Sequence, residues 1–268
     1  MTLLKRLILP SGELFFEARE RRGRYYLTWS RAGAAVVSER GRLLDFTPHP
    51  TAQPVSITIL RRIIAAYAAS LRGHESLHAT GLQRGGQVIA LIGCSGEGKS
   101  TLAASLLQSN RSVRLLSDDV LYLFCRRRRG WVLPSDGAPV LKLARASLQR
   151  LAYGQSGEYE QRYDANFEKE VVIFPNGPPG RRSLPLAAIV HLQRGHALQL
   201  TRLRGTSAAL TLMANTYNAL IRPPKVVQRQ FNLCAAISKC VPIWRLRYES
   251  GFEALPDVGR QVEQLWQC

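Results

Sequence analysis

Residues 88–119 read VIALIGCSGEGKSTLAASLLQSNRSVRLLSDD. The stretch begins with an apolar run, Val88–Ile92, of the length typical of a buried strand. The next residues, GCSGEGKS, match the pattern G-x-x-x-x-G-K-[ST] of a phosphate-binding loop. Thr101–Leu107 follows, with leucines at helical spacing. Strand, glycine-rich turn and helix therefore occur in the order that such a loop requires, although a chance glycine-rich turn is the alternative.

The residue types in this glycine-rich loop, residues 93–100, suit an anion. Gly93, Gly96 and Gly98 can adopt backbone torsions that a side chain would forbid, so successive N–H groups can face one phosphate. The following helix adds unpaired N–H groups and the positive end of its dipole. We expect Lys99 to reach the β- and γ-phosphates and the Ser100 hydroxyl to bind Mg2+. The predicted ATP site comprises Gly93, Cys94, Ser95, Gly96, Glu97, Gly98, Lys99, Ser100 and Thr101.

An acidic pair, Asp118-Asp119, ends the short apolar strand expected at residues 113–117. Only one helix and one strand fit between the glycine-rich loop and this pair, so the acidic strand is the next one in the chain. A carboxylate at that place can hold Mg2+ or accept a proton from an attacking hydroxyl. The alternative is an aspartate pair that only begins a turn.

Composition limits the class of protein. With 268 residues, the chain can form one large domain, or one domain with a small appendage. We expect no membrane-spanning run, and the N-terminus lacks the order of a signal peptide. The five cysteines are scattered without a C-x-x-C pair, which favours reduced thiols in a cytoplasm over disulfides or a zinc site.

The formal net charge of +18 comes mostly from arginine. Arginine-rich codon usage is one explanation, and an acidic partner such as nucleotide phosphates or an acidic peptide is the other. The arginines are not interleaved with aromatic residues, so a nucleic-acid surface is not indicated. Four consecutive arginines, 126–129, fit a solvated turn or a grip on an acidic substrate or a γ-phosphate.

The remaining chain predicts an α/β protein. Residues 1–54 read as a small β-rich segment, and residues 55–268 as the main domain. We expect helices over 55–72, 142–153, 206–221, 225–239 and 255–266. We expect strands over 75–80, 120–124, 131–133, 169–174, 187–192, 198–203 and 243–248, with 187–192 and 198–203 paired antiparallel. Residues 154–166 and 175–180 read as loops.

His78 falls on the strand expected beside the glycine-rich loop. A lone histidine is more often structural, and a catalytic role is the alternative. Lys169 and Arg222 are further candidates for a catalytic role, and for each of them a structural role is the alternative.

His78, Gly93–Thr101 and Ser117-Asp118-Asp119, in this order and at this close spacing, resemble the HPr kinase/phosphorylase-like superfamily. The resemblance covers roughly residues 75–123, and residues 184–192 and 240–248 are similar to its looser C-terminal pattern. It implies a P-loop kinase core of the HPr-kinase type, which is a mixed sheet with flanking helices, preceded here by the β-rich segment.

The resemblance also implies roles for single residues. Asp119 resembles the base that takes a proton from a serine hydroxyl, and His78 its partner. Lys99 resembles the phosphate ligand, and Ser100 the Mg2+ ligand. Asp118 then assists the metal or His78.

Small relatives of this kind resemble lasso-peptide precursor kinases, which phosphorylate the C-terminal serine of a ribosomally made peptide. Thr101 stands where the bifunctional enzymes have an acid, which leaves the reverse phosphorylase reaction open. The expected partner is a peptide or protein with an acceptor serine, and self-association stays open. The main alternative is a P-loop ATPase or regulatory nucleotide-binding module without a peptide acceptor; a small-molecule kinase is another.

Overall fold

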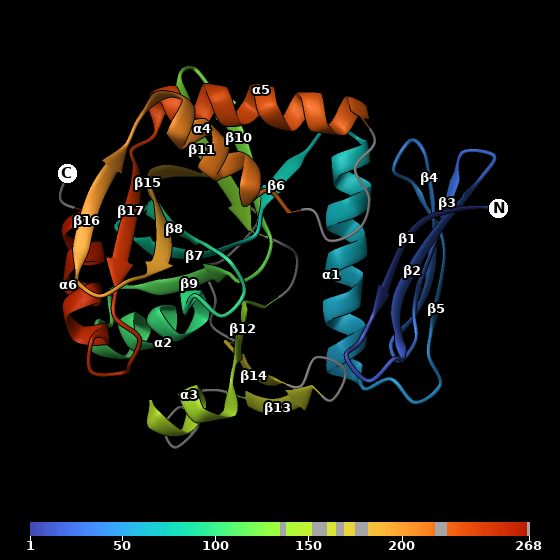
Figure 1. Cartoon of the computed structure of the whole chain (residues 1–268), viewed down its shortest axis with the longest axis horizontal. Coiled ribbons are helices and arrows are strands. Elements are labelled where there is room, and N and C mark those ends of the chain that lie inside the picture. The colour runs from blue at the N-terminus through green and yellow to red at the C-terminus, as the bar shows by residue number, and fades with distance from the viewer. Residues whose placement is uncertain (135–137, 152–159, 165–168, 175–181, 218–223, 267–268) are drawn as a thin grey trace.

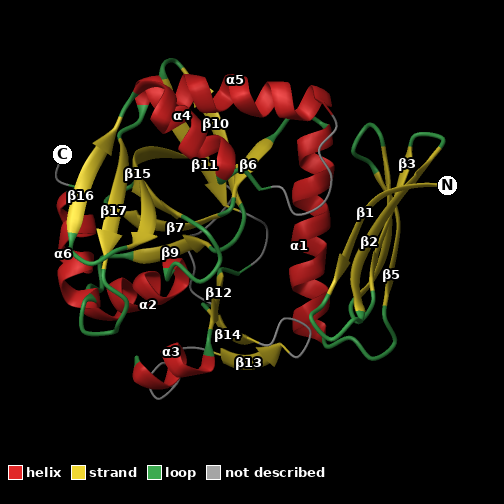
Figure 2. Ribbon diagram, viewed as in Figure 1, coloured by secondary structure: helices red, strands yellow, loops and turns green. Residues whose placement is uncertain are grey.

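The computed structural model describes residues 1–134, 138–151, 160–164, 169–174, 182–217 and 224–266 (Figure 1). It has three parts: an N-terminal antiparallel sheet, a long helix packed on that sheet, and a curled mixed sheet with helices on both faces (Figures 1 and 2). The predicted mixed α/β fold is therefore confirmed. An HPr-kinase-type P-loop core is a finer assignment and stays a prediction.

The N-terminal sheet is a simple antiparallel meander. Its strands are β1 (Thr2–Ile8), β2 (Leu14–Arg21), β3 (Arg24–Trp29), β4 (Gly33–Ser38) and β5 (Leu43–Pro48). Alternate side chains of β2 and β3, among them Phe16, Leu27 and Trp29, are buried. They pack against Leu60 and Ile64 of the helix α1 (Pro54–Leu71), because period-2 alternation places one face of the sheet on one apolar helix face.

Helix α1 contacts the N-terminal sheet on one face and strands from the later part of the chain on another. Besides the meander, its first turns place Val55 and Ile59 against Val140 and Val171. The division after residue 54 therefore stays a prediction. By length and composition α1 could cross a membrane, but 56% of these 18 residues are buried, as in the core helix of a folded domain.

The mixed sheet is centred on β8 (Gln87–Ile92) and β15 (Leu184–Arg194), which run parallel. The strand order is β6-β10-β11-β15-β8-β7-β9, with β17 also on β15 and β16 on β17. The other strands are β6 (Glu75–Leu77), β7 (Ala79–Arg84), β9 (Arg114–Ser117), β10 (Leu121–Arg126), β11 (Arg129–Pro134), β16 (Gln199–Leu203) and β17 (Ile243–Tyr248).

Helices cover both faces of this sheet. Ile89 and Leu91 face α2 (Lys99–Ser109) and α6 (Leu255–Gln264). Val88, Ala90 and Ile92 face α4 (Gly205–Ala214) and α5 (Pro224–Cys240). Burial on both faces explains why this strand is a continuous apolar run and not an alternating one.

A small third sheet has the order β12-β14-β13 and lies between α1 and α2. Its strands are β12 (Val140–Leu143), β13 (Glu160–Asp164) and β14 (Lys169–Ile173), and α3 (Arg145–Arg150) follows β12.

The helix expected over residues 142–153 is wrong in its first part. Lys142 lies on β12, and the helix α3 begins only at Arg145. Val140 packs under α1, whereas Leu141 and Leu143 pack towards α2. Burial of both faces favours a strand over a helix with one apolar side.

The pairing expected between residues 187–192 and 198–203 is also wrong. β17 lies between these two segments, parallel to β15 and antiparallel to β16. Because β15 already has β8 on its other edge, the segment after it can only pair further out, on β17. The loop expected over 154–166 is wrong at Glu160–Asp164, which forms β13 because it pairs antiparallel with β14. The rest of that loop, the end of the 206–221 helix, the 175–180 loop and Arg222 lie outside the described residues.

Candidate active site

The glycine-rich loop joins β8 to α2 and depends on torsions that glycine allows. Gly93, Gly96 and Gly98 have φ values of 147°, 90° and 89°. A Cβ on Gly98 would lie 2.5 Å from the Tyr248 hydroxyl oxygen, and one on Gly93 would lie 2.9 Å from the Leu192 carbonyl oxygen. The loop is therefore packed closely against the ends of β15 and β17.

Arg194 and Tyr248 hold the loop from behind. The Arg194 backbone N–H donates to the Glu97 carboxylate at 2.8 Å, and its guanidinium donates to the Gly96 carbonyl at 3.4 Å. The same guanidinium lies 4.9 Å from the centre of the Tyr248 ring, and the Tyr248 hydroxyl donates to the Glu97 carbonyl. These contacts hold the loop backbone against β15 and β17.

Lys99 begins α2 and is folded back onto the loop. Its ammonium donates to the carbonyl oxygens of Gly93 at 2.8 Å and Cys94 at 3.1 Å. Burial lowers the pKa of Lys99, and the charges of Asp118 and Asp119 oppose that shift. The ammonium therefore rests on neutral oxygens, which a phosphate can replace as a stronger partner.

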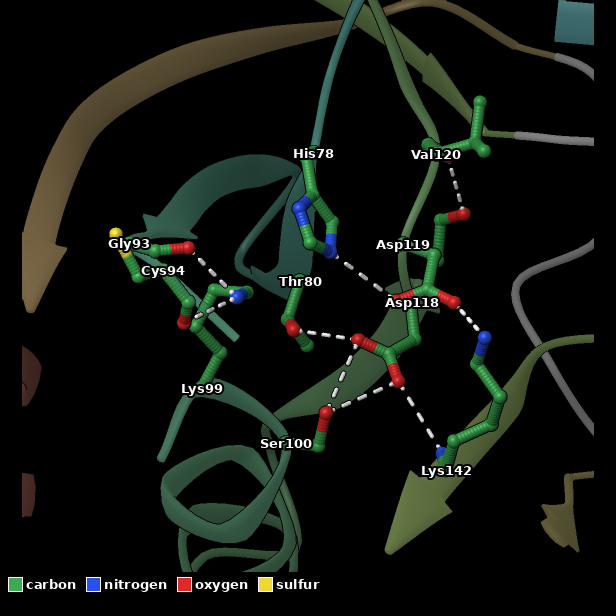
Figure 3. Close-up of polar contacts among 11 residues, drawn as sticks. His78, Thr80, Gly93, Cys94, Lys99, Ser100, Asp118, Asp119, Val120 and Lys142 are labelled. Carbon is green, nitrogen blue, oxygen red and sulfur yellow. Dashed lines mark hydrogen bonds and ion pairs between the residues drawn. The ribbon is translucent and has the colours of Figure 1, made fainter. Parts of the chain in front are cut away.

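Asp118 is buried beside Ser100 (Figure 3). Its carboxylate accepts hydrogen bonds from the Thr80 hydroxyl at 2.6 Å, the Ser100 hydroxyl at 3.1 Å and the Lys142 backbone N–H at 3.2 Å. Burial, together with the negative charge of Asp119, raises the pKa of Asp118, while the Thr80 and Lys142 contacts oppose that shift. Four segments of the chain thus meet at one carboxyl group.

Asp119 lies between two cationic or basic side chains. One oxygen is 3.5 Å from His78 Nε2, and the other contacts the Lys142 ammonium (Figure 3). Burial favours the neutral acid, but Lys142 and His78 outweigh it and lower the pKa of Asp119. Its φ of 68° is in the left-handed region, which aspartate tolerates better than most residues and which is enriched at functional sites.

His78 lies in the break between β6 and β7. Its backbone N–H donates to the Asn215 carbonyl at 2.8 Å, and its ring stands edge-on to Tyr217. Its side chain is 37% exposed, which differs from a core histidine. The structure brings His78 to Asp119, and its catalytic role stays a prediction.

A cleft of about 660 Å³ opens over these groups. Of the residues predicted from sequence, its lining includes His78, Ser95, Gly96, Gly98, Lys99, Ser100, Thr101 and Asp119. Gly93, Cys94 and Glu97 are not among the described lining residues; they accept the contacts that hold Lys99 and Arg194. Thr101 also shares a hydrogen bond of 3.1 Å with Ser147 of α3.

The oxygens of Ser100 and Asp118 fit a magnesium ion. They are hard ligands 3.1 Å apart, at the edge of the loop. Mg2+ is typically bound by one or two protein oxygens together with phosphates and water. Within the part of the chain that the structure describes, no group of three His, Cys, Asp or Glu side chains suited to a metal occurs, so a closed protein cage is not formed there.

Three cations of the cleft were missed or underrated by sequence reasoning. The sequence places Lys142 on a predicted helix, gives Lys169 only as a further candidate and does not single out Arg194; all three line the cleft. The short apolar run around Lys142, Val140–Leu143, fits a strand buried on both faces as well as it fits a helix, and it is the one local signal for a strand there. The arginines at 126–129 form the exposed β10–β11 turn, as in the solvated-turn alternative.

No protein-family model and no curated protein matches this chain. Among solved structures, the chain is similar to the Hpr(Ser) kinase/phosphatase from Coxiella burnetii. That match has a TM-score of 0.36 and 10% sequence identity, and covers 72% of this chain and 88% of the other.

Proposed function

We propose that this protein is an ATP-dependent kinase that transfers the γ-phosphate to a serine hydroxyl of a peptide or protein. One observation carries the proposal: a single cleft brings the loop residues Lys99 and Ser100 to Asp119, while the Ser100 hydroxyl donates to the buried Asp118 beside it. A phosphate cradle beside an ionised carboxylate is the minimum that phosphoryl transfer to an alcohol requires. The HPr-kinase-type P-loop core read from the sequence motifs is part of this proposal.

In the proposed reaction, Asp119 accepts the proton of the serine hydroxyl while the serine oxygen forms a bond to the γ-phosphorus. The bond from that phosphorus to the β–γ bridging oxygen breaks, and ADP leaves. Lys99 moves from the loop carbonyls onto the phosphates, and His78 holds Asp119 in position. Positioned charges of this kind supply most of the catalysis in phosphoryl transfer.

Ser100 and Asp118 would hold Mg2+, which when bound neutralises phosphate charge. Thr80 keeps the Asp118 carboxylate turned towards Ser100, since its hydroxyl donates to Oδ1 and leaves Oδ2 facing the serine. Thr80 therefore acts as a positioning residue for the metal ligand.

The finer proposal is that the acceptor is the C-terminal serine of a ribosomally made precursor peptide of the lasso type, phosphorylated in the cytoplasm. It is supported by the resemblance of the motifs to precursor kinases and by the excess of basic residues around the cleft. A terminal serine carries its own carboxylate, and a basic site attracts such a chain end.

Incubation with γ-labelled ATP and serine-containing peptides tests the kinase proposal against the ATPase alternative. The kinase transfers label to the peptide, and alkaline release of that label identifies a phosphoserine. Label found only as free inorganic phosphate, with every peptide tested, would favour the ATPase or regulatory module.

A further inference from the structure

Two lysines reach the cleft from the small sheet, across the acidic pair from the glycine-rich loop. Lys142 pairs with Val171 in the β12–β14 register, and Lys169 lies two residues from Val171 on the same strand face. Diagonal neighbours of this kind are about 7–8 Å apart. Figure 3 shows Lys142 on the opposite side of Asp118 and Asp119 from Lys99.

The strand pattern explains why both lysines face the cleft. Val140 and Val171, which share their faces, are buried against the first turns of α1. Further along the same face, Lys142 and Lys169 pass beyond that apolar contact and line the cleft. On this face of the sheet, the valines that pack against α1 are therefore followed, two residues along each strand, by lysines that line the cleft.

The charges of the cleft are unequally satisfied. On the loop side, Lys99 and Arg194 donate to loop carbonyls. On the far side, the Lys142 ammonium contacts Asp119, whereas Lys169 forms an ion pair with none of the described residues. Burial is the largest cause of the lowered pKa of Lys99, and the positive charge of Lys169 also lowers it. The charge of Lys169 is therefore close enough to affect the loop side of the cleft.

We propose that Lys169, together with Lys142, forms a subsite for an anionic group of the acceptor, namely a carboxylate in the same residue as the reacting hydroxyl. The inference rests on the proposed kinase function. When that hydroxyl lies at Asp119, its neighbouring carboxylate lies beside Lys142, which is already in contact with Asp119. Lys169 then supplies the charge that Lys142 shares with Asp119.

Two matched peptides test the subsite. Both end in the same sequence with serine last; one has a free carboxylate and the other a C-terminal amide. Binding of each fluorescent peptide to the full chain, loaded with a non-hydrolysable ATP analogue and Mg2+, is measured by anisotropy. Transfer from ATP is measured separately as kcat/KM. We expect the acid to be preferred about 10- to 100-fold, the size of one strong charge-assisted hydrogen bond.

Variants assign that preference to a residue. Lys169→Met should reduce the acid-to-amide ratio about tenfold or more, mainly through KM, and Lys169→Arg should restore most of it. Lys239→Met, which removes an exposed charge from the last turn of α5, should leave the ratio unchanged. Circular dichroism and binding of the ATP analogue verify that the variants are folded.

Equal use of the acid and the amide by the unaltered protein would overturn the subsite. So would an equal loss for both peptides in Lys169→Met, because that result assigns Lys169 to the transferred phosphoryl group. Acid preference in binding without any transfer would support the subsite and contradict the kinase. Transfer to both peptides without acid preference would support the kinase and contradict the subsite.

Discussion

The two sides of the cleft are built differently. The loop side comes from one continuous stretch, residues 93–101, in which the glycines, Lys99 and Ser100 follow one another. The far side is assembled from segments widely separated in the chain: His78, the acidic pair, Lys142 and Lys169. The first side depends on local torsions and the start of one helix, and the second on strand pairing over long separations. A motif can therefore reveal the whole of the first side, while the assembly of the second is visible only in the fold.

The largest effect is expected on the loop side. Lys99→Met removes the only ammonium that rests on the loop carbonyls among the described residues. Phosphoryl transfer should fall by about 10³-fold or more, because a cation on the transferred group is lost. Transfer of labelled phosphate under saturating ATP measures it, and Lys225→Met, an exposed change on α5, serves as the control. If the variant keeps a tenth of the normal rate or more, Lys99 does not stabilise the transferred phosphoryl group.

The next effect tests the acidic residue of the far side. Asp119→Asn should reduce transfer by about 10²- to 10⁴-fold, the range of a lost general base, while ATP binding is nearly preserved. Preservation is expected because the Asp119 contacts in the structure are to His78 and Lys142 and not to the loop. Calorimetric ATP binding and the transfer rate are measured on the same preparation. A near-normal rate would show that Asp119 is not the base.

A glycine pair tests how far the loop side also depends on a contact from outside the loop. Gly96→Ala and Gly98→Ala both place a side chain at a φ near 90°, which costs about 1–2 kcal/mol. Only the Gly98 variant also drives its Cβ against the Tyr248 hydroxyl, whereas nothing lies within 4 Å at Gly96. ATP affinity should therefore fall more in Gly98→Ala, and Tyr248→Phe in that background should recover part of it. Equal losses in the two variants would mean that backbone strain alone matters.

The smallest effect concerns the contact that joins the two sides. Ser147 is buried and shares a hydrogen bond with Thr101, so it ties α3 to α2. Ser147→Ala should lower the free energy of unfolding by about 1 kcal/mol, the net value of one such bond. Thermal melting with the exposed Ser207→Ala as the reference measures the difference. An unchanged melting temperature would show that the two sides are held together by packing alone.

Sequence reasoning was accurate where spacing is local. The strand before the glycine-rich loop, the helix after it and the short strand before Asp118 all occur close to their expected bounds. It failed at Lys142, because four residues buried on both faces resemble the start of an apolar helix as much as a strand. It also failed for the partner of β16, although the strand itself occurs where expected. The partner is β17, a segment forty or more residues later in the chain.

From the sequence alone came the loop with its lysine and serine, the acidic pair and the histidine, because each is recognised by residue type within a short span. Only the tertiary structure decided that these groups share one cleft and that its far wall is cationic. The physical reason is that Lys142 and Lys169 owe their direction to strand register and to the burial of Val140 and Val171 beneath α1. A local pattern does not identify the distant segments that supply either one, here β14 and α1.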